Sequence, residues 1–398
     1  MLASIAALNA PGVSSREAGN SATGLSGATL AWSPFVLTAN AAVAIARTRG
    51  SRIAADGSSW PYRWARALGT AIYGCLALWL SYRLALRFAP PPAALLATTA
   101  IWLASSLPVY MYMLTFTAHA IAMFTAVLAV TLWLGVRDGR DTRIQWLAWG
   151  LASGFAIIVS LFNTAFLIVA LVEFLARLAR RSAFRQTLIN GVLFLAGAVA
   201  VVVPALAIRR QADGGWLTDG HSPVMHWTRP ALAATAVSPE HGAFLWTPIL
   251  LAAALGLFVA IRRQPLIGGA LAAAGAAFTY LVAAHAGDAD PAFGGALLLP
   301  LTPLFVCGLA SLVDACAGRR GRIAWTAAAS AALFFVLWNL GLMLQWGTGL
   351  IPDRAPLDLR QAAANQLTTV PRAAKDFVIR YASDRKALVS DLRRRARE

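Results

Sequence analysis

The chain has 398 residues, of which 59% are hydrophobic and 13% are charged, and its mean hydropathy is +0.63. Soluble domains carry about 25% charged residues, so this composition excludes an ordinary soluble protein. The net charge of +17 comes from arginines placed in pairs and triplets between apolar stretches. This scatter excludes a single basic face for nucleic acid. The composition instead predicts a polytopic α-helical membrane protein.

The apolar stretches predict the transmembrane helices. A bilayer core about 30 Å thick needs about 20 apolar residues per helix. The segment 30–46 contains Pro34 and is predicted to be an interfacial helix. The apolar stretch 144–178 is too long for one helix, so a tight break is predicted between Ser160 and Asn163. About ten spans are expected in all, at 66–87, 93–109, 118–136, 144–160, 162–178, 187–208, 244–261, 266–285, 295–315 and 323–345.

Arginines predict the orientation of these helices. Cytoplasmic loops are enriched in Lys and Arg, and the gaps 110–117, 159–163 and 286–294 contain neither. We therefore expect the arginine-containing gaps to be cytoplasmic and the longer segments 47–65 and 209–243 to be extracytoplasmic. The arginines in question are Arg83, Arg87, Arg137, Arg140, Arg143, Arg177, Arg180, Arg181, Arg185, Arg262, Arg263, Arg319, Arg320 and Arg322.

The same pattern divides the chain into three regions. Residues 1–65 are expected to form an extracytoplasmic or interfacial N-terminal segment, and residues 66–346 a transmembrane bundle with the outer loop 209–243. Residues 347–398 are expected to form a basic amphipathic tail. Such a tail would lie on an anionic membrane surface or bind a partner.

Polar residues at the outer ends of the spans are functional candidates. His119 lies at the outer start of the span 118–136, where an ionisable residue suggests a function, the alternative being a satisfied interhelical hydrogen bond. Asn163, at the predicted break, would line a cavity. Glu173 is near the cytoplasmic end, and we expect it to pair with Arg177 one helical turn later.

A second group of candidates precedes the span 244–261. The sequence SPEHG brackets an acid and an imidazole with a proline and a glycine. Glu240 could act as a base or cation ligand and His241 could donate to a phosphate. The alternative is an ordinary helix N-terminus, where acidic residues favour the helix dipole.

Metal chemistry has weaker support. Asp288 and Asp290 are two residues apart and could share a divalent cation, but the sequence favours a plain solvated turn. The spacing of the histidines in the outer loop does not match a reliable metal-ligand pattern. We therefore predict no metal site, and the cofactor stays unknown with a divalent cation as one possibility.

Aromatic and basic residues at the expected membrane boundary form a third group. Tyr62 and Arg63 lie in an outer loop that could hold a lipid phosphate or anchor the chain. Arg229 and Trp246 flank the SPEHG sequence. A tryptophan at this level is either an interfacial anchor or a stacking surface for a sugar.

Several of these strings, in this order, resemble a known family. They are ADGSSWPYRWARALGTAIYG, TAHAIAMF after an aromatic turn, GLASGFAIIVSLFN, SPEHGAFLWTPILLAAALGL, FGG before a proline-containing span, and VLWNLGLMLQWGTGLIP. Together they resemble the bacterial relatives of dolichyl-phosphate-mannose protein mannosyltransferases. These are multispanning glycosyltransferases of the GT-C fold.

The resemblance implies a helical bundle with an outer cavity. It also implies transfer of a sugar from a polyprenyl-phosphate carrier to a glycan, lipid or protein acceptor outside the cytoplasm, in a bacterial inner membrane. By the resemblance, His119 and the Glu240–His241 pair line the cavity, and Arg63 or Arg229 contacts the phosphate. Members carry catalytic acids in a first outer loop after a first span. By the resemblance, the first span and the acidic loop are expected to be missing here, and Glu17 is the only acid before Asp56.

Two other functions are compatible with the sequence. A non-catalytic membrane subunit of the same fold, active in envelope assembly, is favoured by the missing acids. A transporter of a lipid-linked substrate is the other, although transporters often show internal repeats and midplane polar residues. In this chain the polar residues gather at one face instead.

Overall fold

The structure is a computed structural model that describes residues 27–179, 184–213, 224–286, 293–318, 321–351 and 356–383. Its α-helices are α3 (Gly27–Thr48), α4 (Trp60–Ala85), α5 (Pro91–Leu103), α6 (His119–Arg137), α7 (Arg143–Val159), α8 (Leu167–Ala179), α9 (Phe184–Asp213), α10 (Leu232–Val237), α11 (Ala243–Trp246), α12 (Ile249–Arg263), α13 (Pro265–Ala284), α14 (Thr302–Ala317), α15 (Gly321–Gly347) and α16 (Leu359–Ser383). Shorter elements are the π-helical turn η2 (Val109–Met113), the 3-10 helices η3 (Leu161–Phe166) and η4 (Ala296–Leu301), and the paired two-residue strands β1 (Val224–Met225) and β2 (His285–Ala286).

The predicted membrane helical bundle is confirmed. Within the described ranges, seven helical segments are long and apolar enough to cross a membrane. Six of them coincide with predicted spans: Leu161–Ala179, His119–Arg137, Phe184–Gln211, Pro265–Ala284, Ala296–Ala317 and Gly321–Gly347. The seventh, Gly27–Thr48, was expected to be a short interfacial helix, but its 22 residues are enough to span a bilayer.

The remaining predicted spans are also helical, but they differ in length. Three of them correspond to α5, α7 and α12, which have 13, 17 and 15 residues. The fourth is α4, with 26 residues. The predicted break after α7 is observed, because Ser160 has an extended backbone and η3 begins at the next residue.

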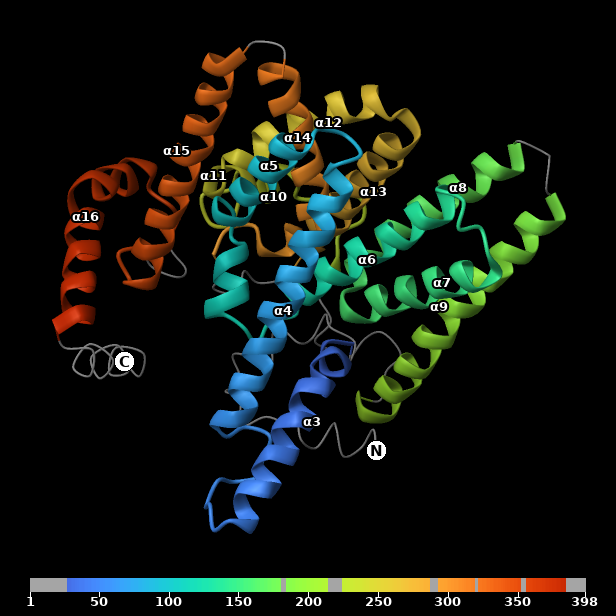
Figure 1. Cartoon of the computed structure of the whole chain (residues 1–398), viewed down its shortest axis with the longest axis horizontal. Helices are drawn as coiled ribbons and strands as arrows, with labels where there is room; N and C mark the ends of the chain where they lie inside the picture. The colour runs from blue at the N-terminus through green and yellow to red at the C-terminus, as the bar shows by residue number, and fades with distance from the viewer. Residues whose placement is uncertain are drawn as a thin grey trace.

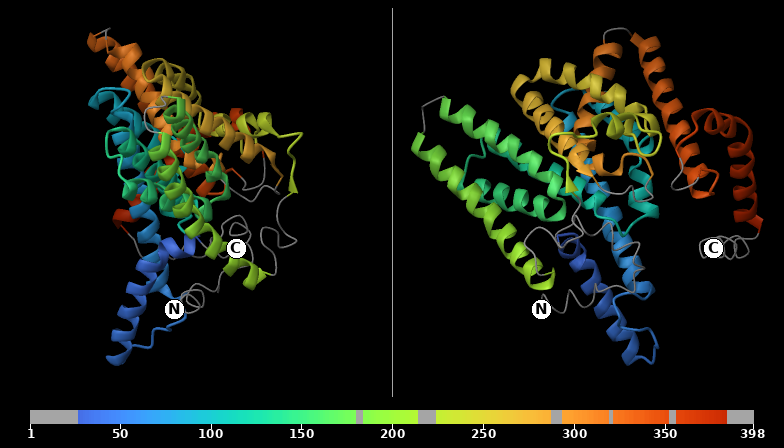
Figure 2. Two further views of the ribbon diagram at one scale, coloured as in Figure 1. Left: turned by 90° about the vertical axis from the view of Figure 1, so that its right-hand side faces the viewer. Right: turned by 180° about the vertical axis from the view of Figure 1, so that it is seen from behind.

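The arginine-containing turns gather on one side of the molecule. The end of α4 and the start of α5, the end of α8 and the start of α9, the end of α12 and the start of α13, and the end of α14 and the start of α15 all lie in the upper part of Figure 1. The central group of α5, α12, α13 and α14 is flanked by α7, α8 and α9 on one side and by α15 and α16 on the other, as Figures 1 and 2 show. We call the side that carries these turns the arginine-rich end.

Glycines set the closest helix contacts. A Cβ atom at Gly150 would lie 2.0 Å from the carbonyl oxygen of Phe194, so α7 and α9 touch through their backbones. A Cβ at Gly256 would lie 2.0 Å from the carbonyl oxygen of Gly308, which brings α12 equally close to α14. Membrane helices associate through such small residues, because apolar side chains gain little over lipid contacts.

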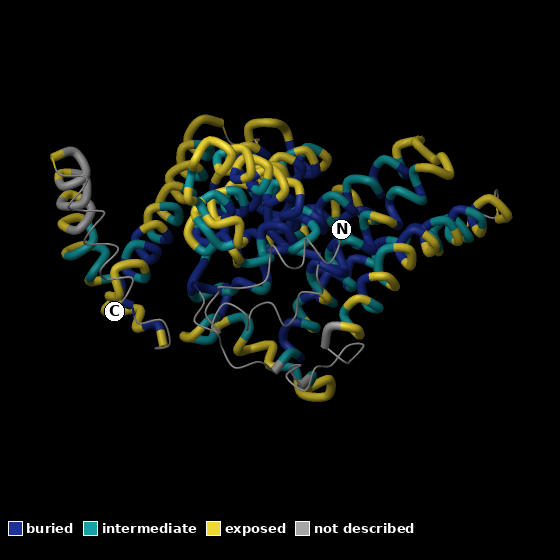
Figure 3. The backbone as a smooth tube through the Cα atoms, turned by 90° about the horizontal axis from the view of Figure 1, so that it is seen from below, coloured by how far each residue is buried: buried dark blue, intermediate teal, exposed yellow. Residues whose placement is uncertain are grey.

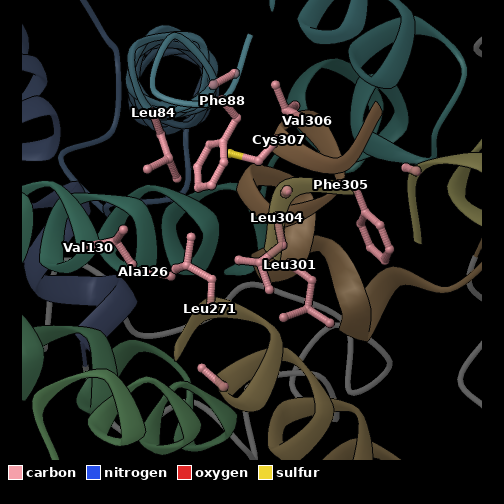
Figure 4. Close-up of a cluster of buried hydrophobic side chains, with 14 of the residues drawn as sticks. Leu84, Phe88, Ala126, Val130, Leu271, Leu301, Leu304, Phe305, Val306 and Cys307 are labelled. Atoms are coloured by element: carbon pink, nitrogen blue, oxygen red, sulfur yellow. The ribbon is translucent and has the colours of Figure 1, made fainter. Parts of the chain in front are cut away.

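The interior is apolar and continuous through the central helices. Buried backbone concentrates in the middle of the molecule in Figure 3, whereas the outer helices carry exposed faces. Figure 4 shows one part of this core, where Cys307 of α14 lies beside Phe88, and Leu304 lies beside Leu301. Burial of this kind fixes the ends of the helices and therefore positions the side chains that extend from them.

An ion network closes the arginine-rich end. Glu173 of α8 is 3% exposed and accepts hydrogen bonds from Arg177 at 2.8 Å, Arg137 of α6 at 2.6 Å and the Trp133 indole at 2.9 Å. The predicted Glu173–Arg177 pair is thus confirmed. Asp141 extends the network, because it accepts from Arg177 and from the Trp146 indole of α7.

Candidate functional site

Phe293 organises the other end of the molecule. Its side chain is fully buried, and its backbone N–H donates to the Tyr110 hydroxyl at 3.1 Å, while that hydroxyl faces the Phe293 carbonyl oxygen at 3.4 Å. The rings of Trp246 and Trp346 meet the Phe293 ring edge to face, at centroid distances of 5.2 and 5.8 Å. We call Tyr110, Trp246, Phe293 and Trp346 the Phe293 cluster.

The directions in which the helices run show at which end of the bundle the Phe293 cluster lies. α12 starts next to Trp246 and ends at Arg263, and α15 starts next to Arg322 and ends next to Trp346. Tyr110 follows α5, whereas Arg87 precedes it. The Phe293 cluster therefore lies at the end of the bundle opposite the arginine-rich end, which the arginine distribution predicts to be extracytoplasmic.

His119 adjoins the cluster. It is the first residue of α6 and is partly buried, and its ring meets the Tyr110 ring edge to face at 4.7 Å. One turn along α6, the carbonyl oxygen of Ala122 accepts a hydrogen bond from Asn163 Nδ2 at 3.2 Å. The first turn of α6 thus brings together two of the predicted site residues.

Asn163 is held tightly. It is 1% exposed, and its Nδ2 also donates to the carbonyl oxygen of Ala156 at 3.1 Å. Its Oδ1 is buried and has no hydrogen-bond partner among the described residues. The sequence suggested that Asn163 lines a cavity; the structure shows that it joins the α7–η3 break to α6.

His285 is a neighbour that the sequence analysis missed. Its ring meets the Phe162 ring edge to face at 5.3 Å, next to Asn163, and burial lowers the pKa of His285. Its imidazole is therefore neutral at neutral pH and has one donor and one acceptor nitrogen. An ionisable residue directly after the long apolar helix α13 was the available signal.

The SPEHG sequence forms a fixed turn. Gly242 donates from its backbone to Ser238 at 2.8 Å, and the Pro239 carbonyl oxygen accepts from the Trp246 indole at 3.0 Å and from the Leu357 backbone at 2.8 Å. Glu240 is exposed. His241 is partly buried, and no described residue hydrogen-bonds its buried Nδ1 atom. The turn thus leaves an acid at the surface and an imidazole with one nitrogen available inside.

The predicted aromatic candidates have structural roles. Trp246 is 2% exposed, and both its N–H and its ring are engaged within the protein. Tyr62 is fully buried and donates its hydroxyl hydrogen to Asn40 Oδ1 at 2.8 Å. Both rings lie on the inner side of their helices, and their contact with a substrate stays a prediction.

The predicted cations are at the surface. Arg63 and Arg229 are exposed. Arg66, by contrast, is 8% exposed, donates from Nη2 to the Gly57 carbonyl oxygen at 2.9 Å and lies over the Phe116 ring at 5.3 Å. Arg66 follows the buried Tyr62 by four residues, so the two side chains share one face of the helix. This spacing was the sequence signal that Arg66 faces inward.

The remaining candidates lie outside the described residues or lack metal-site geometry. Glu17, Asp288 and Asp290 are outside the described ranges. Within those ranges, no group of three His, Cys, Asp or Glu side chains could hold a metal ion. The described part of the site offers imidazoles, amides and indoles around an aromatic cluster.

The site can be compared with known proteins. No protein-family model matches the chain, and no curated protein matches it either. Two solved structures are similar: ArnT from Cupriavidus metallidurans bound to undecaprenyl phosphate, with 15% identity over 77% of this chain, and the same protein in the apo state, with 16% identity over 79%. The TM-score is 0.46 in both cases. The chain spans 63% of the length of these ArnT structures, and no residue role follows from the likeness.

Proposed function

We propose that this integral membrane protein is a glycosyltransferase that moves a sugar from a polyprenyl-phosphate carrier to an acceptor on the extracytoplasmic side of a bacterial inner membrane. One observation carries the proposal. The strings that resemble lipid-linked-sugar transferases are distant in sequence, yet four of them meet around Phe293 through the contacts of Tyr110–His119, Trp246 and Trp346. Convergence at one end of the bundle is expected of a functional site.

The chemistry of the transfer suits this position. The acceptor hydroxyl oxygen forms a bond to the anomeric carbon as the bond from that carbon to the phosphate oxygen breaks. The departing polyprenyl phosphate takes the electron pair, and a carboxylate takes the hydroxyl proton. The phosphate stays at headgroup level because its lipid chain is anchored in the bilayer.

We propose roles for individual residues from their positions. Donors that face the departing phosphate stabilise its charge, and His119 and His241 are the candidates at the inner side of the site. Glu240 is the described acid of the SPEHG turn, and it can take a proton because it is exposed. Glu17, which is outside the described ranges, is the second candidate base. Arg63 and Arg229 are proposed to attract the anionic carrier at the surface.

The first test is carrier binding. The purified chain in detergent is titrated with undecaprenyl phosphate, and the melting temperature is followed, because a ligand that binds the folded state stabilises it. Undecaprenol is the control for the lipid chain alone. His119→Ala is expected to weaken the phosphate-dependent effect roughly 10- to 150-fold, the range for one hydrogen bond to a charged group. His226→Ala, an exposed histidine outside the cluster, is the matched control.

The second test is turnover. Proteoliposomes receive polyprenyl-phosphate-linked hexoses together with a membrane extract as acceptor source, and release of polyprenyl phosphate is measured. Release that is lost in Glu240→Gln or His241→Ala supports the transferase. Carrier binding without release under every condition would favour the non-catalytic subunit. A chain that responds equally to undecaprenol and undecaprenyl phosphate contradicts the proposal.

A further inference from the structure

The helices α3 and α4 form a hairpin that extends away from the central helices. The Tyr73 hydroxyl donates to the Ala31 carbonyl oxygen at 2.8 Å, and the Tyr62 hydroxyl donates to Asn40 Oδ1 at 2.8 Å. The two helices therefore run antiparallel along the first half of α4. The turn between them lies at the bottom of Figure 1, opposite the arginine-rich end. We call residues 45–59, the last turn of α3 with this connection, the hairpin tip.

The hairpin tip carries cations without acidic partners. Arg47, Arg49 and Arg52 are exposed, and no described residue forms an ion pair with any of them. The one acid in the sequence of the tip is Asp56, and its carboxylate accepts two backbone N–H groups of its own turn, at 2.9 and 2.8 Å. The helix dipole favours Arg47 at the end of α3, but Arg49 and Arg52 follow the helix.

The position of these arginines is unusual for a membrane protein. The orientation expected from the arginine-containing turns places the hairpin tip on the extracytoplasmic side, where short loops are depleted of Lys and Arg. Three exposed guanidinium groups in a short connection on that side indicate an anionic partner. The planar guanidinium group matches phosphate in particular, because it can donate two parallel hydrogen bonds to it.

An exposed apolar ridge on α4 shows how this hairpin meets the membrane. Trp60 and Trp79 are 19 residues apart, which is about 28 Å along a helix and close to the bilayer core of about 30 Å. Tryptophan is enriched at both boundaries of that core, and Arg83 lies over the Trp79 ring at 5.7 Å. The ridge consists of six side chains at intervals of three or four residues, each between 38% and 71% exposed: Trp60, Trp64, Leu68, Ile72, Leu76 and Trp79.

The ridge sets the level of the hairpin tip. Asn40 of α3 contacts Tyr62 of α4, and Arg47 is seven residues beyond Asn40. At 1.5 Å per residue, Arg47 lies about 10 Å farther out than Tyr62 and about 7 Å farther out than Trp60. The headgroup region outside the bilayer core is about 5–8 Å thick. With Trp60 at the boundary of the core, the arginines of the tip are therefore level with the lipid phosphates.

We propose that the hairpin tip binds the phosphate groups of anionic glycerophospholipids in the outer leaflet of the membrane. Charge complementarity selects an anionic partner, and the continuity of the tip with the apolar ridge selects lipid over a soluble anionic polymer. A zwitterionic lipid fits less well because its own ammonium group neutralises the phosphate. The inference does not rest on the proposed transfer reaction, because it concerns the hairpin tip and none of the residues of the Phe293 cluster.

The test uses a fluorescent label within the tip. Ala54 is exposed, so Ala54→Cys is labelled with the environment-sensitive dye NBD in the Cys75→Ala/Cys316→Ala background; the third cysteine, Cys307, is buried. The full chain is reconstituted into vesicles of phosphatidylcholine alone or with one third phosphatidylglycerol. Phosphatidylglycerol is expected to shift the emission to shorter wavelengths, because the tip is drawn into the headgroup layer. High salt is expected to reduce the shift.

Three sets of substitutions separate charge from structure. Arg47→Gln/Arg49→Gln/Arg52→Gln is expected to lose most of the shift, because each arginine near an anionic surface contributes roughly fivefold to binding. The corresponding triple lysine variant keeps the charge and is expected to retain the shift. The matched control neutralises three exposed cations of α16, in Arg360→Gln/Arg372→Gln/Lys375→Gln, and is expected to shift as the wild type does.

Other results would overturn the proposal. Equal emission in the two kinds of vesicle would show that the tip does not bind anionic lipid, and a shift with heparin but not with phosphatidylglycerol would assign it to an anionic polymer. A shift that persists in the glutamine variant would place the lipid elsewhere. Stabilisation by undecaprenyl phosphate is expected to persist in the glutamine variant and to weaken in His119→Ala, so failure of the lipid surface and failure of the carrier site are distinguishable.

Discussion

The two ends of this molecule treat polar groups in opposite ways. At the arginine-rich end, the buried carboxylate of Glu173 is saturated by two arginines and an indole, and Asp141 links the same network to α7. At the Phe293 end, buried atoms of Asn163, His241, Asn339 and Gln345 have no partner among the described residues. At the arginine-rich end, the protein's own side chains supply the partners of the buried Glu173 carboxylate. At the Phe293 end, these buried atoms are left without such partners in the described part of the chain.

This difference separates stability from function. A buried charge is tolerated only when it is paired and hydrogen-bonded, so the Glu173 network must be complete for the helices α6 and α8 to dock. An unpartnered neutral amide or imidazole costs less free energy than an unpaired charge. It can therefore be maintained in the unliganded protein at the end where a ligand would bind.

The largest effect is expected from a substitution that breaks the Glu173 network at the arginine-rich end. Glu173→Gln leaves Arg137 without its carboxylate partner and is expected to lower the free energy of unfolding by about 3–5 kcal/mol, as for other broken buried pairs. The measurement is equilibrium unfolding in mixed micelles with increasing SDS. Asp138→Asn is the matched control, because its ion pair with Arg87 is at the same end but exposed, and it is expected to cost less than about 1 kcal/mol. Equal effects of the two substitutions would show that the network is not structural.

An intermediate effect is expected between the two ends, where helix backbones touch. Gly150→Ala places a methyl group 2.0 Å from the Phe194 carbonyl oxygen, and the strain is expected to cost about 1–3 kcal/mol. Gly269→Ala adds the same methyl group to α13 with no atom within 4 Å. It should be neutral or stabilise by up to about 1 kcal/mol through helix propensity. Changes of opposite sign in the free energy of unfolding of the two variants would confirm the close contact. No change in either variant would contradict it.

The smallest effect is expected for Asp56, a hydrogen-bonded carboxylate at the Phe293 end. Asp56 accepts backbone hydrogen bonds from Ser58 and Ser59 at the start of α4, and these lower the pKa of Asp56 from 3.8 to about 2. A lowered folded-state pKa contributes stability above the unfolded pKa, and this is lost as pH falls through the folded one. The wild type is therefore expected to melt slightly higher than Asp56→Asn at pH 5, and the difference should vanish between pH 4 and 2. A difference that stays constant over this range would contradict the assignment.

Local patterns in the sequence were enough to locate much of the fold. Six predicted spans match apolar helices, the break after α7 occurs at Ser160, and Glu173 pairs with Arg177. Each of these depends on residues within one or two turns of each other. Local patterns did not show which face of a helix is buried. Tyr62 and Trp246 are buried and have internal hydrogen-bond partners, and their contact with a substrate stays a prediction.

The sequence by itself determined that the chain forms membrane helices and which turns carry the arginines, because hydropathy and charge act along the local chain. Only the tertiary structure decided which polar groups are satisfied. Tyr110 and Phe293 are 183 residues apart, and Asn339 and Ser105 are 234 apart. Contacts over such separations depend on how whole helices pack. Which buried polar atoms have no partner among the described residues is therefore decided only once that packing is complete.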